Sequence, residues 1–357
     1  MTPSNRQAIL ILGMHRSGTS ALTRVISLLG YRLPSHLIPA SQHNIQGFWE
    51  TQALADFHDR VLQSAGSSWH DWAKFNPEWH ASPLFQDACR ELQAIVQAEF
   101  GESGPIVVKD PRICRLLPLW QAALTALHID LTVILPLRNP LEIARSLGQR
   151  DGFTEQTALL IWLRHVLDAE QAARGLPRAF CAYETLLSNW RGTLGQIADH
   201  TGLVWPRRSL DSELEIDSFL SADVRHHTLS PAGLATRPEI PCWIPDAYAA
   251  LQQLIDHPHD ESAQQRLDAT REDFDRACAL LGLATRAEER EAARYRQKTA
   301  ELTAQVARLD SELEAARHWA EASDDALREQ TAETVRLDNE LEAARRWAET
   351  ADATAQE

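Results

Sequence analysis

The sequence predicts a three-layer α/β/α domain, in which helices cover both faces of a central parallel sheet, followed by a long C-terminal helix. Four short runs rich in Ile, Val and Leu, bounded by glycine, proline or charged residues, have the length and composition of buried strands. The segments between them are long enough for crossover helices, and apolar strands joined by helices are typical of parallel sheets. From Thr285 onward the chain lacks proline and glycine and is dominated by Ala, Glu, Arg and Leu, which favours a helix.

The predicted strands are residues 8–12, 105–108, 131–137 and 178–183. Helical patterns cover about 17–30, 49–65, 83–100, 115–127, 140–150, 154–174, 184–201 and 260–283. Residues 222–245 carry four prolines and two adjacent histidines, and we expect an ordered loop or a lid there. The change in composition predicts two domains, an α/β domain over residues 1–284 and a helical tail over residues 285–357.

Composition and charge limit the class of protein. Of the 357 residues, 44% are hydrophobic and 24% are charged, as in a globular protein that can bury a core. The formal net charge of −15 disfavours nucleic-acid binding, which needs clustered Lys and Arg. The five cysteines are widely spaced, so neither a disulfide framework nor a zinc site is expected. Because no run approaches the ~18 apolar residues of a transmembrane segment and no signal peptide is recognisable, we expect a cytoplasmic protein.

The tail contains an internal repeat, RLDSELEAARHWAE at 308–321 and RLDNELEAARRWAE at 336–349, with a period of 28 residues. If Val306 is position a of a heptad, the a and d positions alternate in steps of three and four residues, as in a left-handed coiled coil. These seam residues are Val306, Leu309, Leu313, Ala316, Ala320, Ser323, Leu327, Gln330, Thr334, Leu337, Leu341, Ala344 and Ala348. Because alanine and polar residues weaken the seam, self-association, pairing with a partner helix and a lone charged helix all stay open.

A glycine-containing segment, Gly13–Ser20, follows the first predicted strand and reads GMHRSGTS. Between a strand and a helix, such a loop can present backbone N–H groups and the positive end of a helix to a phosphate. The spacing of Gly13 and Gly18 matches the pattern G-x-x-x-x-G-K-[ST], but Thr19 occupies the position of the lysine that reaches a triphosphate. The basic residue of this loop is Arg16 instead, so a different phosphate ligand is expected.

A second basic element follows the third predicted strand. Arg138 stands at the end of that strand, where a triphosphate site would need an Asp to anchor magnesium. Ser146 follows eight residues later, just over two helical turns away. Arginine and a hydroxyl group make a good phosphate clamp. Two separate clamps predict a ligand with two separated phosphates, bound without a metal ion.

These elements resemble the sulfotransferases that use 3′-phosphoadenosine 5′-phosphosulfate (PAPS). GMHRSGTSAL, GFWE, VVKDPRIC and LRNPLEIARSL are similar to segments of a bacterial branch of that family, and the resemblance covers about residues 7–283. It implies a P-loop-like α/β domain, PAPS as the donor co-substrate and no metal. The residues implied for the 5′-phosphosulfate are Gly13, His15, Arg16, Ser17, Gly18, Thr19 and Ser20. For the 3′-phosphate, the resemblance implies Arg138 and Ser146. It further implies Tyr183 of AYETLL beside the adenine and Arg225 in a late basic segment that covers the 3′-phosphate.

Sulfuryl transfer needs a base for the acceptor proton and positive groups for the charge on the bridging oxygen and the sulfonate. The resemblance implies Glu50 as the base, and Lys109 and Arg16 as the positive groups. Lys109 ends the second strand, on the side where open α/β sheets bind ligands. The structural alternative for Glu50 is a helix N-terminal carboxylate stabilised by the helix dipole. The alternative bases are Asp56, His43 and Asp110.

The acceptor has no recognisable motif. Four tryptophans either line an acceptor cleft or belong to the core: Trp49, Trp69, Trp72 and Trp79. Tryptophan faces suit sugars and other rings, which is the reason for the cleft alternative. The resemblance to the family implies a small-molecule or glycan acceptor, such as a carbohydrate or another cell-surface precursor. Two other functions stay open. One is a P-loop kinase for a nucleotide or small molecule, and the other is a scaffold whose coiled coil is the working part and whose P-loop domain is vestigial.

Overall fold

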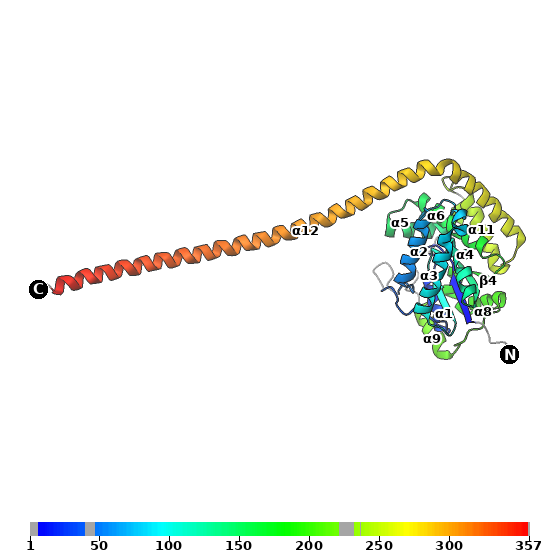
Figure 1. Ribbon diagram of the computed structural model, residues 1–357, viewed down its shortest axis with the longest axis horizontal. Helices are drawn as coiled ribbons and strands as arrows, with labels where there is room; N and C mark the ends of the chain where they lie inside the picture. Colours follow the sequence, from blue (N-terminus) through cyan, green and yellow to red (C-terminus); the bar gives the residue numbers. More distant parts are fainter. Residues whose placement is uncertain (1–5, 40–46, 221–231, 236, 356–357) are drawn as a thin grey trace. The chain divides into compact units, whose positions relative to one another are not determined.

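Four parallel strands form the centre of the computed structural model, which describes residues 6–39, 47–220, 232–235 and 237–355 (Figure 1). The strands are β1 (Arg6–Ile11), β2 (Ile106–Lys109), β3 (Ile129–Leu137) and β4 (Arg178–Ala182), in the order β2-β1-β3-β4. All four predicted strands and the parallel sheet are confirmed. In the register of the sheet, Ile9 of β1 is aligned with Val107 of β2 and with Thr132 of β3. Because β2 and β3 flank β1 on opposite sides, the carboxyl end of β1 is the switch point at which such sheets bind ligands.

Helices cover both faces of the sheet, because the strands are apolar on both faces. Along β1, Ala8 and Leu10 belong to one cluster of buried side chains, whereas Ile9 and Ile11 belong to the other. The first cluster includes residues of α2 (Gln52–Ser64), α3 (Pro83–Phe100), α4 (Ile113–Ala126), α5 (Pro140–Asp151), α6 (Glu155–Ala172) and α11 (Trp243–Asp256). The second includes residues of α1 (Thr19–Leu28), α7 (Tyr183–Ser188), α8 (Trp190–Thr201) and α9 (Leu210–Phe219). The predicted three-layer arrangement is therefore confirmed.

Three parts of the helix prediction were wrong. The pattern over 184–201 forms two helices, because Asn189 leaves helical geometry (φ −149°, ψ 63°) and its side chain caps α8 by accepting from the Gly192 N–H. The helix α9 was missed, since its sequence is mostly polar. The prediction of a loop over 222–245 is wrong at its end, where α11 begins at Trp243 after a short helix, α10 (Ala232–Ala235). Residues 221–231 and 236 lie outside the described residues.

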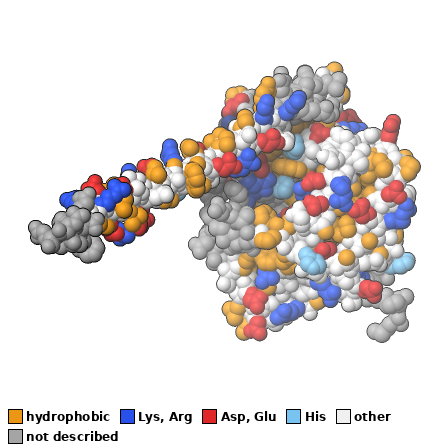
Figure 2. Space-filling view, turned by 60° about the vertical axis from the view of Figure 1, so that its left-hand side comes forward, with side chains coloured by type: hydrophobic (Ala, Val, Ile, Leu, Met, Phe, Trp, Pro, Cys, Tyr) orange, Lys and Arg blue, Asp and Glu red, His pale blue; other side chains and the backbone are white. Residues whose placement is uncertain are grey.

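One helix, α12 (Glu261–Ala355), contains the predicted helix 260–283 and the described part of the tail. The chain divides into two compact units, Met1–Gly282 and Leu283–Glu357. In the second unit the seam leucines of the repeat are 51–61% exposed, and apolar side chains lie exposed among charged ones along the helix (Figure 2). A long C-terminal helix is therefore confirmed. None of the described helices combines the length and the apolar character that crossing a membrane would require.

Candidate active site

The loop Gly13–Ser20 connects the end of β1 to the first turn of α1, as predicted. Arg16 and Gly18 both have left-handed backbone conformations, with φ of 71° and 87°. Left-handed residues in such a turn direct neighbouring backbone N–H groups to one side, which makes a concave surface for an anion. No side chain caps α1 at its N-terminus. The N–H groups of its first turn are therefore available to a ligand of negative charge.

Gly18 lets the ring of Tyr183 lie directly on this loop. A Cβ atom at Gly18 would come 2.1 Å from Cδ2 of that ring. Tyr183 was predicted as the last residue of a strand, but β4 ends at Ala182 and Tyr183 begins α7. The Arg138 guanidinium also lies over the Tyr183 ring, 5.1 Å from the ring centroid. The structure thus brings Gly18, Tyr183 and Arg138 together.

Gly18→Ala is expected to destabilise the fold by about 1–3 kcal/mol more than Gly152→Ala, because the added methyl group displaces the Tyr183 ring. Gly152 is a matched control, since it also has a positive φ, 73°, but nothing lies within 4 Å of its Cβ position. The difference between the two variants therefore isolates the steric clash from the backbone strain. Urea unfolding of both variants measures it, and equal losses of stability would contradict the packing of Tyr183 on the loop.

The second clamp is joined to the loop through Arg16. Arg138 donates from Nη1 to the backbone carbonyl of Arg16 at 3.0 Å, and from Nε to Glu142 at 2.8 Å. Arg16 in turn donates from Nε to the Ser146 hydroxyl at 2.7 Å. We expected Ser146 to lie within reach of what Arg138 holds, and it lies against the Arg16 guanidinium. The residues proposed for two phosphates therefore form one continuous polar cluster.

A third arginine, Arg150, extends this positive cluster. Burial, followed by the charges of Arg150 and Arg138, lowers the pKa of Arg16. Ion pairs of Arg138 with Glu142 and of Arg150 with Asp151 partly offset this crowding of like charges, and a bound anion would offset it further. The sequence analysis missed Arg150. It lies four residues after Ser146 on α5, and this spacing, which places both side chains on one face of the helix, is the signal that could have found it.

Glu50 and Lys109 form a buried ion pair beside the loop. Lys109 Nζ donates to Glu50 Oε1 and, at 3.2 Å, to the Ser20 hydroxyl. The side chains of Lys109 and Glu50 are 3% and 9% exposed. Burial raises the pKa of Glu50, and the Lys109 ammonium group partly offsets this rise. A lysine, a carboxylate of raised pKa and a loop hydroxyl thus meet at the carboxyl end of the sheet, where acid–base chemistry is expected.

Glu50 does not lie in a helix. It precedes α2, and its carbonyl accepts a hydrogen bond of 2.8 Å from the Ile38 N–H. The neighbouring Thr51 forms an isolated antiparallel bridge with Leu37. Glu50 directly precedes Thr51, the N-cap of α2. It therefore lies beside the positive end of that helix, and the structural alternative of a carboxylate stabilised by the helix dipole stays open.

Asp110 is tied into a buried network behind Lys109. Burial alone would raise the pKa of Asp110, but His58 and Arg112 lower it well below its usual range. The Asp110 carboxylate lies 3.1 Å from His58 Nδ1 and accepts from the Arg112 N–H at 2.9 Å. Trp120 donates to His58 Nε2 at 3.0 Å, so Nδ1 carries the proton that His58 donates to Asp110. A carboxylate held in this way is a weak base.

The other candidate bases lie elsewhere. Asp56 is exposed on α2 and accepts from the Gln52 side chain at 2.7 Å. His43 and Arg225 lie outside the described residues. Within the parts of the chain that the structure describes, no group of three or more His, Cys, Asp or Glu residues is arranged to hold a metal ion.

The structure separates the four tryptophans into two kinds. Trp72 and Trp79 are buried core residues, 5% and 3% exposed. Trp49 is partly exposed and lies against Arg24, whose guanidinium is 4.8 Å from its ring centroid. Trp69 lies at the loop, with its ring centroid 4.8 Å from that of His15. The core alternative therefore applies to Trp72 and Trp79, and the cleft alternative stays a prediction for Trp49 and Trp69.

His15 and Trp69 belong to an aromatic cluster at the loop. The Trp69 ring also contacts Phe153 at 5.8 Å between centroids, and the Arg150 guanidinium lies 6.0 Å from it. Burial, followed by the charges of Arg150 and Arg112, lowers the pKa of His15 well below its ordinary value. Its Nε2 atom is buried and has no hydrogen-bond partner among the described residues. The His15 imidazole is therefore neutral and has hydrogen-bonding capacity that the described residues leave unused.

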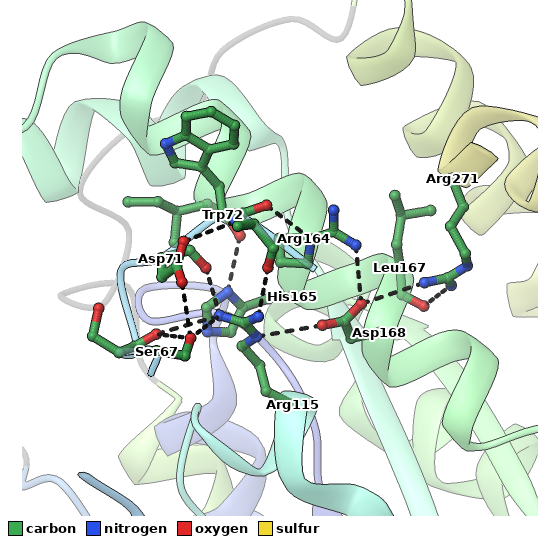
Figure 3. Close-up of polar contacts among 12 residues, drawn as sticks. Ser67, Asp71, Trp72, Arg115, Arg164, His165, Leu167, Asp168 and Arg271 are labelled. Carbon is green, nitrogen blue, oxygen red and sulfur yellow. Dashed lines mark hydrogen bonds and ion pairs between the residues drawn. The ribbon is translucent and has the colours of Figure 1, made fainter. Parts of the chain in front are cut away.

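The segment that carries Trp69 is held by buried arginines (Figure 3). Arg115 donates to the carbonyls of Asp71 and Ala73 at 2.5 and 2.7 Å, and Arg164 donates to the carbonyl of Trp72 at 2.9 Å. Asp168 forms ion pairs with Arg115, Arg164 and Arg271 at 3.3, 3.4 and 3.3 Å. These residues position Trp69 without reaching the loop themselves, and no pattern in the sequence indicates them.

Comparisons with known proteins identify the family of this chain. A family model described as "Sulfotransferase family" matches residues 8–207. A comparison with curated proteins finds no match. Among solved structures, the chain is similar to the sulfotransferase domain from the Synechococcus PCC 7002 olefin synthase, with 19% identity, 64% of this chain and 91% of that chain covered, and a TM-score of 0.36.

Two further structures are similar at low identity. For a sulfotransferase from Mycobacterium tuberculosis H37Rv, identity is 16%, coverage is 71% of this chain and 77% of that chain, and the TM-score is 0.37. For a retinol dehydratase in a complex with retinol and PAP, identity is 12%, coverage is 76% of this chain and 83% of that chain, and the TM-score is 0.31.

The family match extends over more than half of the chain and contains the loop Gly13–Ser20, both members of the buried ion pair, and Arg138 with Ser146. The chain therefore belongs to the sulfotransferase family.

Proposed function

We propose that this protein transfers a sulfuryl group from PAPS to a hydroxyl or amine of a small-molecule or glycan acceptor. The observation that carries the proposal is the connection of the two phosphate clamps at Arg16, whose guanidinium contacts Ser146 and whose carbonyl accepts from Arg138. Loop N–H groups, guanidinium groups and a hydroxyl thus form one site, and this set of donors fits a nucleotide with two separated phosphate groups.

The donor would be held by three sets of contacts. The residues proposed for the 5′-phosphosulfate are Gly13, His15, Arg16, Ser17, Gly18, Thr19 and Ser20. Arg138 and Ser146 are proposed for the 3′-phosphate. Tyr183, whose ring packs on the loop, offers an aromatic face to the adenine. Arg225 is proposed to cover the 3′-phosphate from the segment that lies outside the described residues.

In the proposed reaction, the acceptor oxygen forms a bond to the sulfur while the bond from sulfur to the bridging oxygen breaks. The electron pair of that bond stays with the departing PAP (3′-phosphoadenosine 5′-phosphate), and the acceptor proton passes to the Glu50 carboxylate. Arg16 stabilises the charge that grows on the bridging oxygen, and Lys109 stabilises the sulfonate in transit. Because the leaving group is good, positioning supplies much of the rate and the step requires no metal.

Lys109 also prepares the base. Its ion pair with Glu50 and its bond to Ser20 fix both groups at the loop before an acceptor arrives. A carboxylate of raised pKa accepts a proton more readily near neutral pH than an exposed one. The raised pKa and the adjacent loop hydroxyl therefore favour Glu50 over Asp56 and Asp110 as the base.

The aromatic cluster of His15, Trp69 and Phe153 is proposed as part of the acceptor site. It adjoins the loop through His15, and the buried arginines hold its segment in place. Flat aromatic faces suit the rings of sugars and phenols, while a neutral imidazole nitrogen can accept from an acceptor hydroxyl. A carbohydrate or another ring-bearing precursor is the acceptor class that fits best.

Calorimetry with PAP and with ATP–Mg²⁺ tests the donor. We expect PAP to bind much more tightly than ATP–Mg²⁺, because Thr19 stands where a triphosphate loop has its lysine. Tight binding of ATP–Mg²⁺ without binding of PAP would instead support a kinase. Labelled sulfuryl transfer from PAPS to a panel of acceptors, followed by mass spectrometry of the products, then tests the reaction and identifies the acceptor class.

Arg138→Ala is expected to weaken PAP binding by about 1.5–3 kcal/mol, because a charge-assisted hydrogen bond to the 3′-phosphate is lost. The control is Arg145→Ala, which removes an exposed arginine from the same segment. Calorimetry should show an affinity near that of the unaltered protein for this control. If both variants bind PAP as tightly as the unaltered protein, the assignment of the 3′-phosphate to Arg138 is wrong.

A further inference from the structure

The tail leaves an apolar face of α12 uncovered. The seam leucines Leu309, Leu313 and Leu327 are 52%, 51% and 61% exposed, and Leu337 and Leu341 are 52% and 51% exposed. A long helix with an apolar stripe is typical of a helix that pairs with another helix, although Ser323, Gln330 and Thr334 interrupt the stripe here. The question is which helix covers the stripe, and in which direction.

Each copy of the 28-residue repeat contributes two leucines followed by two alanines to the seam. The first set is Leu309, Leu313, Ala316 and Ala320, and the second is Leu337, Leu341, Ala344 and Ala348. In a parallel pair in register, every layer would contain the same residue twice. Leucine layers and alanine layers would then demand different distances between the helix axes, which vary between about 8 and 10 Å with the side chains at the contact.

An antiparallel pair removes this conflict. If the two copies of the repeat face each other, Leu313 meets Ala344 of the second chain, and Ala316 meets Leu341. The same alignment places Leu309 against Ala348. Every layer of the repeats then contains one large and one small side chain, so one distance between the axes suits both repeats.

The charges beside the seam specify the same alignment. The e positions within the two repeats carry Asp310, Arg317, Asp338 and Arg345. In antiparallel coiled coils, e positions of the two chains lie opposite each other. The alignment above places Asp310 opposite Arg345 and Arg317 opposite Asp338. A shift of one heptad in one direction would place Asp310 opposite Asp338. A shift in the other direction would place Arg317 opposite Arg345. Repulsion between like charges therefore disfavours both shifted registers.

The ion pairs that form along the helix of a single chain do not use these four charged residues. None of Asp310, Arg317, Asp338 and Arg345 makes an ion pair among the described residues of the tail. Their neighbours do: Arg308 pairs with Glu312, and Arg336 with Glu333 and Glu340. In a parallel pair, ion pairs between the chains would join g positions to e positions. The g residues available for them, Glu312 and Glu340, already pair with arginines of their own helix. Glu333 of one chain would also face Asp338 of the other, which is a repulsive contact.

We propose that the tail pairs with the tail of a second copy of this chain as an antiparallel coiled coil, in which each repeat packs on the other repeat of the partner. The apolar stripe, the alternation of large and small layers and the four e charges carry this inference. It does not depend on the proposed reaction, since it uses no residue of the sulfotransferase domain.

Light scattering and cross-linking of the full chain test the pairing. In a Cys242→Ser background, which removes the exposed cysteine and leaves four buried ones, Ala316→Cys and Leu341→Cys are made separately. The two variants are coexpressed with different tags. A short thiol cross-linker should then join them covalently into a mixed dimer. Each variant alone should not cross-link, because its two cysteines would lie about 37 Å apart along the coil.

The outcomes are distinct. A mass of twice that of one chain, with cross-linking only in the mixed sample, supports the antiparallel pair. Cross-linking of each single variant with itself would establish a parallel pair and overturn the proposal. A monomeric mass at concentrations up to hundreds of micromolar, with no cross-linked species, would also overturn it and leave a lone helix or a different partner as the explanation of the seam.

Discussion

Arg16→Asn is expected to slow sulfuryl transfer by about 10²–10³, the scale for loss of one donor aimed at charge that develops in the transition state. Arg16 has a left-handed backbone, with φ of 71°. Asparagine tolerates this conformation better than alanine does, so the loop should keep its shape. The variant therefore tests the guanidinium group and not the backbone. Single-turnover measurements with labelled PAPS give the rate directly.

Arg16→Lys is the matched comparison. It keeps the positive charge but loses the planar group that donates to the Ser146 hydroxyl at 2.7 Å. We expect an intermediate rate, with PAP affinity reduced less than in the asparagine variant. If Arg16→Asn transferred the sulfuryl group at the rate of the unaltered protein, the catalytic role of Arg16 would be refuted. An unchanged biological activity of that variant, together with loss of activity on deletion of 285–357, would instead support the scaffold alternative.

Glu50→Gln is expected to lower turnover by about 10²–10⁴ while leaving PAP affinity nearly unchanged, because an amide of the same shape cannot take the acceptor proton. Asp56→Asn is the control. It removes an exposed carboxylate six residues away, whose partner is the Gln52 side chain, and should leave turnover intact. Steady-state kinetics and calorimetry separate the two effects. Full turnover in Glu50→Gln would rule Glu50 out as the base.

The pH dependence gives a second test of Glu50. The base acts only when it is deprotonated, so the rate should rise with pH through the pKa of Glu50. Because burial raises that pKa, and Lys109 only partly offsets the rise, the midpoint should lie above the ordinary glutamate value of about 4.3. In Glu50→Gln this acidic limb should disappear from the profile of the residual activity.

The sheet could be predicted from the sequence, and the two segments proposed to bind anions could be recognised in it, because their signals are local. A buried strand is a short apolar run, and the loop Gly13–Ser20 is recognisable by its glycine spacing and its position between a strand and a helix. The element with Arg138 and Ser146 is likewise a spacing along one helix. The tail could be predicted for the same reason, since the heptad seam is a periodic pattern.

Other features depend on contacts that no local pattern encodes. Asn189 interrupts a helix through its own side-chain cap, although the periodicity continues across it. Ser146 was expected to act with Arg138, but its hydroxyl accepts from Arg16, because the fold brings the loop to a residue of α5 that lies 130 positions along the chain. Trp69 and Trp72 lie three residues apart, yet Trp72 is buried in the core and Trp69 lies at the loop, a difference that packing decides.

The sequence by itself determined the parallel α/β class, the loop that takes the place of a triphosphate site and the repeat that defines the tail. Each of these depends on residues that lie close to one another along the chain. Only the tertiary structure decided which side chains meet. The Lys109–Glu50 pair joins residues 59 positions apart, and the Asp110–His58 contact joins residues 52 positions apart. Such contacts form because packing of the helices on the sheet brings distant segments together, and burial then sets the pKa values on which the chemistry depends.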